Sequence, residues 1–346
     1  MGEQEQGVEP RTGALSSVLS AVGRGLTALA RALAIIALVA LLVPVVARLA
    51  GWEAGPLAVI VSLMPWVTLA CVVPIVLSLL ARDWILLGAS AAVAGLCLWW
   101  IAPIFVASTA EGPVALRVAT FSLANGGADA DAVVDLVREH DLDLLALTEL
   151  TPDAQERLEA AGLDDLLPYS AEYPGEWKYG TGLWSTRPLA EAEPLPGFTA
   201  QAIRAEVGLG GDHLTVIVAH PESPGVFDHS GWDADLVSLK AVLEAEQGAV
   251  LVAGDLNTTR DHRGFRQIES YGYVDAVDEA GAGFLATYPS GTFLRHHVPG
   301  SSILAEPLVV IDHILAKDAG IVAAEVDAVE MPRSDHRALV AVYREP

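Results

Sequence analysis

Three apolar runs before residue 107 constrain this chain more than any other feature of its sequence. They cover residues 26–49, 56–81 and 84–106, and the second and third contain no charged side chain. A helix that crosses a bilayer needs roughly 20 apolar residues. The second and third runs meet this length alone, and the first does so if its flanking arginines extend to the lipid headgroups. We therefore expect three transmembrane helices between residues 26 and 106.

Two other interpretations of these runs are weaker. A secretory signal peptide would be shorter, would start earlier and would precede a small-residue cleavage site. Helices buried in a soluble protein would show a polar face, and none of the three runs has one. Four tryptophans near the expected helix ends suit the membrane interface, where Trp is enriched. They are Trp52, Trp84, Trp99 and Trp100.

Arginine placement predicts the orientation, because cytoplasmic loops carry an excess of Lys and Arg. One side of the membrane would hold Arg11, Arg24, Arg31 and Arg82, and the other only Arg48 and Arg117. We expect a multi-pass protein of the cell membrane whose N-terminus is cytoplasmic and whose C-terminal domain is extracytoplasmic. The expected division is a polar tail (1–25), three transmembrane helices (26–106), a linker (107–114) and one domain (115–346).

Formal charge is concentrated after the apolar runs. Residues 1–106 contain five Arg and five acidic residues, which leaves 15 basic and 39 acidic residues for the rest of the chain. The C-terminal part therefore carries the whole formal charge of −24. Such a domain repels the phosphate backbone that a nucleic-acid binder meets with Lys and Arg. Nucleic acid is therefore an unlikely partner, although metal ions in a nuclease would supply positive charge.

From residue 115 onward, short apolar strands alternate with amphipathic helices, which predicts an α/β domain of about 230 residues. Expected helices are Asp131–His140, Asp153–Ala161 and Asp233–Glu246. Expected strands are Ala115–Leu123, Leu144–Leu147, Thr181–Ser185, Ala202–Val207, Leu214–Ala219, Val250–Ala253, Leu308–Leu315, Ala323–Val329 and Ala338–Tyr343.

Polar side chains of the types that perform hydrolysis stand at the ends of these strands. Strand ends open onto loops, where a rigid sheet can direct several side chains into one cleft. Five separate strand ends each supply a carboxylate, an amide or an imidazole. These residues are Glu149, His220, Asp255 with Asn257, Asp312 with His313, and Asp335 with His336.

The ordered set of motifs resembles the endonuclease/exonuclease/phosphatase superfamily over residues 115–346. Its pieces are Thr148-Glu149, the segment 180–188 (GTGLWSTRP), Ala219-His220-Pro221, Gly254-Asp255-Leu256-Asn257, Ile311-Asp312-His313-Ile314 and Ser334-Asp335-His336. The resemblance implies two mixed β-sheets stacked in a four-layered α/β sandwich. It also implies hydrolysis of a phosphate ester or anhydride with a divalent metal, usually Mg²⁺, with Mn²⁺ as an alternative. With its membrane helices, the chain looks most like the membrane-anchored phosphatases linked to teicoplanin-type glycopeptide resistance.

One position departs from the family pattern. The first strand of the family usually ends in an aromatic residue and a metal-binding Asn, but here Phe121 is followed by Ser122. A hydroxyl is a poorer Mg²⁺ ligand than an amide carbonyl. Asn125 could take the place of the missing amide, Ser122 could hold a metal-bound water, or the site could be weakened in a catalytically decayed binding module.

Expected metal ligands are Glu149 and Asp335, with Asn125, because Mg²⁺ prefers hard oxygen atoms. The catalytic candidates are His220, Asp255, Asn257, Asp312 and His336. Asp255 would orient or deprotonate water, and Asn257 would donate to a phosphate oxygen. Asp312 would fix the tautomer of His336. His220 would contact the scissile phosphate or protonate the leaving group, and the substrate-binding candidates are Ser185, Arg187 and His313.

The substrate is left open by the sequence. A tether to the bilayer favours a phosphorylated lipid, because the site then meets a high local concentration of headgroups. A phosphoinositide or sphingomyelin-like headgroup is an alternative. The rival functions are an extracytoplasmic nuclease and a non-catalytic binding module.

Overall fold

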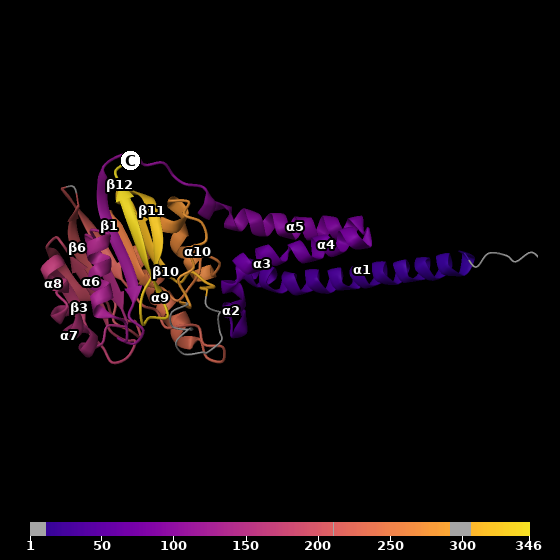
Figure 1. Cartoon of the computed structure of the whole chain (residues 1–346). Helices are drawn as coiled ribbons and strands as arrows, with labels where there is room; N and C mark the ends of the chain where they lie inside the picture. The colour runs from indigo at the N-terminus through magenta and orange to yellow at the C-terminus, as the bar shows by residue number, and fades with distance from the viewer. Residues whose placement is uncertain (1–11, 210, 291–305) are drawn as a thin grey trace, which may run out of the picture. The chain divides into compact units, whose positions relative to one another are not determined.

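The computed structural model describes residues 12–346 except residue 210 and residues 291–305 (Figure 1). The chain divides into two compact units. The first contains residues 1–46 and 64–99, and the second contains residues 47–63 and 100–346. Residues 1–11 of the expected N-terminal tail lie outside the described part. From Thr12 onward the chain is helical, so residues 12–25, which the sequence pattern assigns to the tail, belong to α1.

The first unit is built from long apolar helices. They are α1 (Thr12–Ala50), α3 (Met64–Ala70), α4 (Val72–Ala81) and α5 (Trp84–Ile101). Three stretches are long and apolar enough to cross a membrane, namely Ser16–Ala50, Met64–Ala81 and Trp84–Phe105. Large hydrophobic side chains on all three are exposed, among them Leu26, Leu80 and Trp99. Exposed apolar side chains over this length are stable in lipid and not in water.

The second apolar run of the sequence does not form one helix. Its first seven residues form α2 (Pro56–Ser62), which belongs to the second unit, whereas the candidate span begins at Met64. Pro56 occupies the first turn of α2, where its missing N–H costs nothing. Hydropathy alone could not separate the two parts, because both are uniformly apolar.

Strands of the second unit form two six-stranded mixed sheets. The order of the first sheet is β11-β12-β1-β2-β4-β3, and that of the second is β5-β6-β7-β8-β10-β9. The first contains β1 (Val114–Ser122), β2 (Leu144–Thr148), β3 (Tyr169–Tyr173), β4 (Thr181–Ser185), β11 (Val322–Glu330) and β12 (Arg337–Arg344). The second contains β5 (Leu189–Pro194), β6 (Ile203–Leu209), β7 (Asp212–Val218), β8 (Val250–Asp255), β9 (Val274–Asp275) and β10 (Asp312–Lys317).

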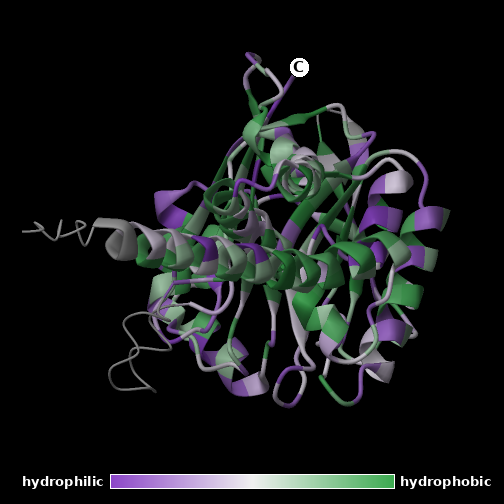
Figure 2. Cartoon of the chain, turned by 90° about the vertical axis from the view of Figure 1, so that its right-hand side faces the viewer, coloured by the Kyte–Doolittle hydropathy of each residue, from purple (hydrophilic) through white to green (hydrophobic). Residues whose placement is uncertain are grey.

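Helices cover the outer faces of the stacked sheets. The longer ones are α6 (Ala130–Glu139), α7 (Pro152–Ala160), α9 (Ser230–Ala245) and α10 (Arg263–Ser270). The shorter α8 (Leu163–Leu166) also packs on the first sheet, whereas η1 (Ala102–Phe105) and α11 (Ala276–Glu279) contribute Ile104, Ala276 and Val277 to the cluster between the sheets. Figure 1 shows α6, α7 and α8 gathered beside the first sheet, and Figure 2 shows mostly hydrophobic strands with helices that alternate hydrophobic and hydrophilic residues. This confirms the four-layered sandwich.

Three buried clusters hold these layers together. The central one lies between the sheets and includes Leu116, Val216 and Ile314. A second joins the first sheet to α6, α7 and α8, and a third joins the second sheet to α9 and α10. Strands such as β2 and β8 are buried along their whole length, which is why they read as continuous apolar runs rather than alternating ones.

Pairing register brings the polar strand ends to one edge of the sandwich. In the first sheet, Ser122 is paired with Thr148, so the carboxyl ends of the parallel strands β1 and β2 coincide. In the second sheet, Asp312 at the start of β10 is paired with Asp255 at the end of the antiparallel β8. Asp312 therefore begins its strand, whereas the sequence pattern places it inside a strand that starts at Leu308.

Candidate active site

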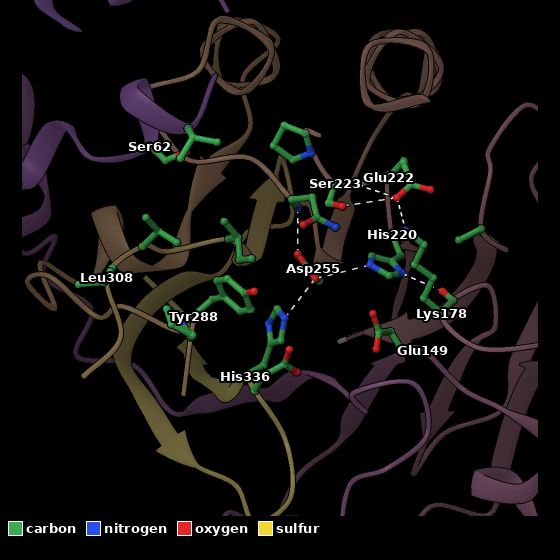
Figure 3. Close-up of a pocket in the computed structure, with 18 of the residues that line it drawn as sticks. Ser62, Glu149, Lys178, His220, Glu222, Ser223, Asp255, Tyr288, Leu308 and His336 are labelled. Carbon is green, nitrogen blue, oxygen red and sulfur yellow. Dashed lines mark hydrogen bonds and ion pairs between the residues drawn. The ribbon is translucent and has the colours of Figure 1, made fainter. Parts of the chain in front are cut away.

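A cavity of about 540 Å³ opens at this edge of the second unit. Its walls contain Glu149, Asp255, Asp335, His220 and His336. Figure 3 shows Glu149, His220, Asp255 and His336 turned toward a common space. The structure thus brings together side chains that lie up to 187 positions apart in the sequence, from Glu149 to His336.

His336 and Asp312 form a buried pair at the base of this cavity. The imidazole Nδ1 lies 2.9 Å from the Asp312 Oδ2, within the range expected for a hydrogen bond between them. Nδ1–H donates to the carboxylate, so Nε2 is the nitrogen that faces Asp255. Burial opposes protonation, but Asp312 and Asp255 outweigh it and raise the pKa of His336 to about 10. A positively charged imidazole here is complementary to a phosphate.

Asp255 lies between two imidazoles. Its Oδ2 is 3.5 Å from Nε2 of His220 and 3.6 Å from Nε2 of His336, distances that suit a charge interaction rather than a short hydrogen bond. Burial would raise the pKa of Asp255, but His336 and His220 together lower it. The carboxylate is therefore ionised, as a group that accepts a proton from water must be.

A hydrogen bond to the backbone orients the His220 ring. Its Nδ1 lies 3.1 Å from the carbonyl oxygen of Lys178 and donates to it, which leaves Nε2 facing Asp255. Burial lowers the pKa of His220, yet the bond to Asp255 and the nearby Glu149 carboxylate raise it above the usual value. His220 therefore presents a polar nitrogen to the cavity, as the sequence predicts for a strand-end histidine.

Asn257 follows β8 in a left-handed turn, with φ of 47°. Its backbone N–H donates to Asp255 Oδ1 at 2.9 Å, and its side-chain amide donates to the carbonyl oxygen of Pro221 at 2.9 Å. Asn tolerates this backbone region better than most residues. The residue lines the cavity, but its amide nitrogen already holds the loop after β7 in place.

Glu149 directs a carboxylate into the cavity from the end of β2, and its backbone is left-handed, with φ of 60°. A helix-capping role for this acid is not what the structure shows, because Thr151 caps α7 through a 3.1 Å bond from Ala154 N–H. Burial raises the pKa of Glu149 above its usual value. Such a carboxylate is poorly compensated by the surrounding protein atoms, as expected of a metal ligand.

Neither substitute for the missing family asparagine lines the cavity. Asn125 is exposed, and its backbone N–H, not its side chain, bonds to the Glu149 carboxylate. The turn directs the peptide group of Asn125 toward Glu149, and a metal-ligand role for its side-chain amide stays a prediction. Ser122 is fully buried, and its hydroxyl oxygen has no hydrogen-bond partner.

A divalent cation fits the donor set of this cavity. Glu149, Asp255 and Asp335 supply hard oxygen atoms of the kind that Mg²⁺ prefers. Lys178 is the one Lys or Arg on the cavity wall as described, and it is paired with Glu222. Among the described residues, Asp255, Asp312 and His336 also bring three ligand atoms within 4.8 Å of one another. Asp312 and His336 already bond to each other, so the cavity-facing carboxylates are the better oxygen donors.

Ser185 and Arg187 lie outside the cavity, which corrects the expectation that they contact substrate. Ser185 pairs with Leu144, at the opposite end of β2 from Glu149, and its hydroxyl accepts the Arg187 N–H at 2.9 Å. Arg187 donates to the carbonyl oxygen of Gly208. Motif residues spread along a whole strand cannot all reach the same end of the sheet.

His313 is also displaced from the site, because successive residues of a strand point to opposite faces. It is fully buried, with Nδ1 2.6 Å from Asp275 Oδ2 and Nε2 2.9 Å from the Thr258 carbonyl oxygen. The predicted substrate contact is therefore corrected to a structural one. His313 and Asp275 repeat the His–Asp arrangement of the cavity pair, but on the face of the second sheet where Phe265 of α10 packs on His313.

Several cavity residues carry no recognisable signal in the sequence. Lys178 and Glu222 come from two loops and form an ion pair at the cavity wall. Tyr288 stacks at a tilt on His336, with ring centroids 4.9 Å apart. Val59, Ser62 and Leu63, from α2 and the residue after it, complete the wall. No motif marks these positions, since folding alone brings them to the site.

A two-sheet sandwich that collects carboxylates and imidazoles at one end is an architecture for metal-assisted hydrolysis. The chain belongs to the Endonuclease/Exonuclease/phosphatase family, whose sequence model matches residues 119–336. Members of this family are metal-dependent phosphoesterases or nucleases, and they cleave phosphodiester or phosphate ester bonds. The comparison with curated proteins finds no match.

Solved structures share the same fold at low sequence identity. An AP endonuclease from Archaeoglobus fulgidus is 19% identical, with a TM-score of 0.51 over 66% of this chain and 99% of that one. A 3′ phosphatase from Neisseria, bound to a product DNA hairpin, is 18% identical, with a TM-score of 0.52 over 66% and 98%. A protein from Beutenbergia cavernae described as endonuclease/exonuclease/phosphatase is 18% identical, with a TM-score of 0.51 over 67% and 72%. At this identity the likeness concerns the fold alone.

Proposed function

We propose that this protein is a membrane-anchored, Mg²⁺-dependent phosphoesterase that hydrolyses a phosphate ester or anhydride of a lipid. The observation that carries the proposal is the convergence of Glu149, Asp255 and the His336–Asp312 pair in one cavity. Glu149 and Asp335 would hold the metal, which would polarise the phosphate. Asp255 would orient or deprotonate the attacking water, and His220 and His336 would contact phosphate oxygens.

The chemical character of the cavity supports an amphiphilic substrate. Acidic and imidazole groups occupy one part of its wall, and Leu308, Val309 and Ile311 line another part. The three apolar helices support a position at a membrane, where a phosphorylated lipid is abundant relative to soluble esters. The resemblance of the sequence to the membrane-anchored teicoplanin-resistance-type phosphatases is the reason that we propose this branch of the family for the chain.

Nucleic acid is a poorer substrate for this site. The C-terminal part carries all of the formal charge of −24, and the one Lys or Arg on the described cavity wall is neutralised by Glu222. A DNA backbone would meet repulsion that bound metal ions offset only locally. A decayed binding module is also disfavoured, because the cavity keeps its dyad, its carboxylates and both imidazoles together.

A substrate panel tests the proposal directly. We expect the full-length protein in proteoliposomes, with Mg²⁺, to release phosphate from lipid phosphates or pyrophosphates with a kcat/KM at least about tenfold above that for DNA hydrolysis. The lower value for DNA follows from the acidic surface. Preferential cleavage of DNA would identify a nuclease instead, and preferential cleavage of lipid phosphodiesters would identify a phosphodiesterase. Failure to hydrolyse any ester with Mg²⁺ or Mn²⁺ would favour a binding module.

We further propose that the cavity is extracytoplasmic. The excess of Arg on the N-terminal side supports this orientation. Three crossings also place the segment between the first two spans on the same side as the C-terminal domain, and that segment packs within the second unit. A reporter fused after Glu345 that functions only outside the cytoplasm should be active. Activity of a reporter that functions only in the cytoplasm would contradict the placement.

A further inference from the structure

Residues 47–63, here called the juxtamembrane segment, comprise the last four residues of the first candidate span and the link from it to the second. They nevertheless belong to the compact unit that contains the active site, and not to the helical unit on either side of them in sequence. An ordinary loop between two transmembrane helices needs no such attachment. The contacts that hold the segment in place therefore indicate a function for it.

Polar contacts fix the first half of the juxtamembrane segment to α10 and to the loop before it. Arg48 Nε donates to Asp261 Oδ1 at 2.6 Å, and both side chains are about nine-tenths buried. The carbonyl oxygen of Arg48 accepts a 2.9 Å bond from Arg266. Farther along, the Glu53 carboxylate accepts the backbone N–H of Arg263 at 2.6 Å. A buried ion pair is costly to form unless its geometry is well satisfied, so this one specifies a defined position.

The middle of the segment is attached through α2. His262 is buried, its Nδ1 accepts the Thr259 N–H, and its Nε2–H donates to the Ala58 carbonyl oxygen at 2.9 Å. Burial lowers the pKa of His262 to about 4, so the ring is neutral and this donor–acceptor arrangement is stable at neutral pH. Ala58 itself is fully buried against Trp232 and Leu236. These contacts position one face of α2 on the second unit.

Neighbouring positions of the same segment line the catalytic cavity. Val59, Ser62 and Leu63 line it together with the apolar residues Leu308 and Val309. Figure 3 shows Ser62 and Leu308 on one side of the cavity and Glu149 and His220 on the other. Val59 is 41% exposed although it is apolar, so it is available to a ligand. The cavity therefore has an acidic, metal-binding end and an apolar end.

The polypeptide chain joins the apolar end of the cavity directly to the second candidate membrane span. Leu63 immediately precedes Met64, the first residue of the second candidate span. Neighbouring loops add exposed aromatic side chains, because Trp177 is 73% exposed beside the cavity residue Lys178, and Phe227 is fully exposed near Pro224. Exposed Trp and Phe side chains are typical of surfaces that contact the bilayer interface.

We propose that the juxtamembrane segment is a built-in part of the substrate site, in which Val59 and Leu63 bind the hydrocarbon chain of a lipid phosphate while its phosphate occupies the acidic end. This rests on the proposed function for the identity of the head group, but the chain-binding wall can be tested without catalysis. It follows that residues 47–63 determine substrate specificity, and that the C-terminal domain alone lacks one wall of its own active site.

The test compares two soluble, non-hydrolysable ligands, hexylphosphonate and methylphosphonate, with the full-length protein in nanodiscs and Mg²⁺. We expect the native protein to bind the hexyl compound at least about tenfold more tightly, because five additional CH₂ groups leave water. Val59→Ser combined with Leu63→Ser should reduce that ratio at least about fivefold, with methylphosphonate affinity unchanged. Leu308→Ser, on the same apolar side of the cavity, should reduce the ratio in the same direction.

Leu57→Ser is the matched control, because Leu57 lies on the same helix but lines a different groove. It should leave the ratio unchanged. Equal affinity of the native protein for the two phosphonates, or a ratio that the Val59 and Leu63 substitutions do not alter, would overturn the proposal. A protein that binds hexylphosphonate preferentially but hydrolyses no phosphate ester would refute the proposed activity while retaining the chain-binding wall.

Discussion

Replacing His336 with alanine should lower kcat for phosphate-ester hydrolysis at least roughly 100-fold, the usual contribution of a positioned acid–base or donor group. The imidazole is held by Asp312 at 2.9 Å, and its other nitrogen faces Asp255 in the cavity. Asp312→Asn should cost much of the same factor, because it removes the carboxylate that fixes the tautomer. The double variant should be little worse than either single one, because the two residues act as a unit. Steady-state kinetics with the purified full-length protein measure all three.

The other buried His–Asp pair provides a matched control. His313 and Asp275 are as deeply buried as the cavity pair but do not line the cavity. His313→Gln should therefore lower Tm while leaving kcat per folded molecule close to the native value. If His336→Ala lost no more activity than His313→Gln, the cavity pair would have only a structural role.

Removing divalent metal should abolish hydrolysis, and Mg²⁺ or Mn²⁺ should restore it. Burial disfavours the charged form of Glu149, and Lys178, the one Lys or Arg on the described cavity wall, is paired with Glu222. A bound cation would therefore stabilise the Glu149 carboxylate. Glu149→Gln keeps the shape but loses the charge, and it should raise the Mg²⁺ concentration for half-maximal activity at least about tenfold or eliminate activity. Activity titrations with Mg²⁺ after treatment with a chelator measure this effect.

Two further measurements make the metal prediction specific. Mg²⁺ should raise the Tm of the native protein, because a ligand that binds only the folded state stabilises it, and should do so less for Glu149→Gln. Glu325→Gln is the control, since this exposed acid on β11 pairs with Arg344 and lies away from the cavity. It should titrate like the native protein. Full activity in excess chelator would exclude a metal-dependent mechanism.

The identities of the central groups follow from the sequence because short buried strands and the polar residues after them are both local signals. Asp255 follows one continuous apolar strand and Glu149 follows another. Both are therefore predicted to lie in loops at the ends of a sheet without any knowledge of the fold. The resemblance adds the pairing of Asp312 with His336, and the structure places their atoms at the expected separation. Their catalytic roles stay predictions until they are measured.

Local patterns fail where function depends on the direction of a strand or on register. Ser185 and Arg187 share a motif with Gly180, but β4 carries them to the end of the sheet that lies away from Glu149. His313 follows Asp312 directly, yet strand alternation turns it to the opposite face of β10, toward Asp275 and Phe265. Asn125 directs its peptide N–H toward Glu149 because of a left-handed turn that composition does not reveal.

By itself, the sequence determined the apolar helices, an α/β domain and the polar residues at its strand ends, because hydrophobic periodicity and strand ends are encoded within short windows. The two-sheet sandwich followed from the family resemblance. Tertiary structure alone decided which of those residues share the cavity and that residues 47–63 complete it. The apolar run from Pro56 to Ala81 has uniform hydropathy, so nothing local separates α2 from the span that follows. Contacts from Asp261 and His262, more than 200 positions away, make that division.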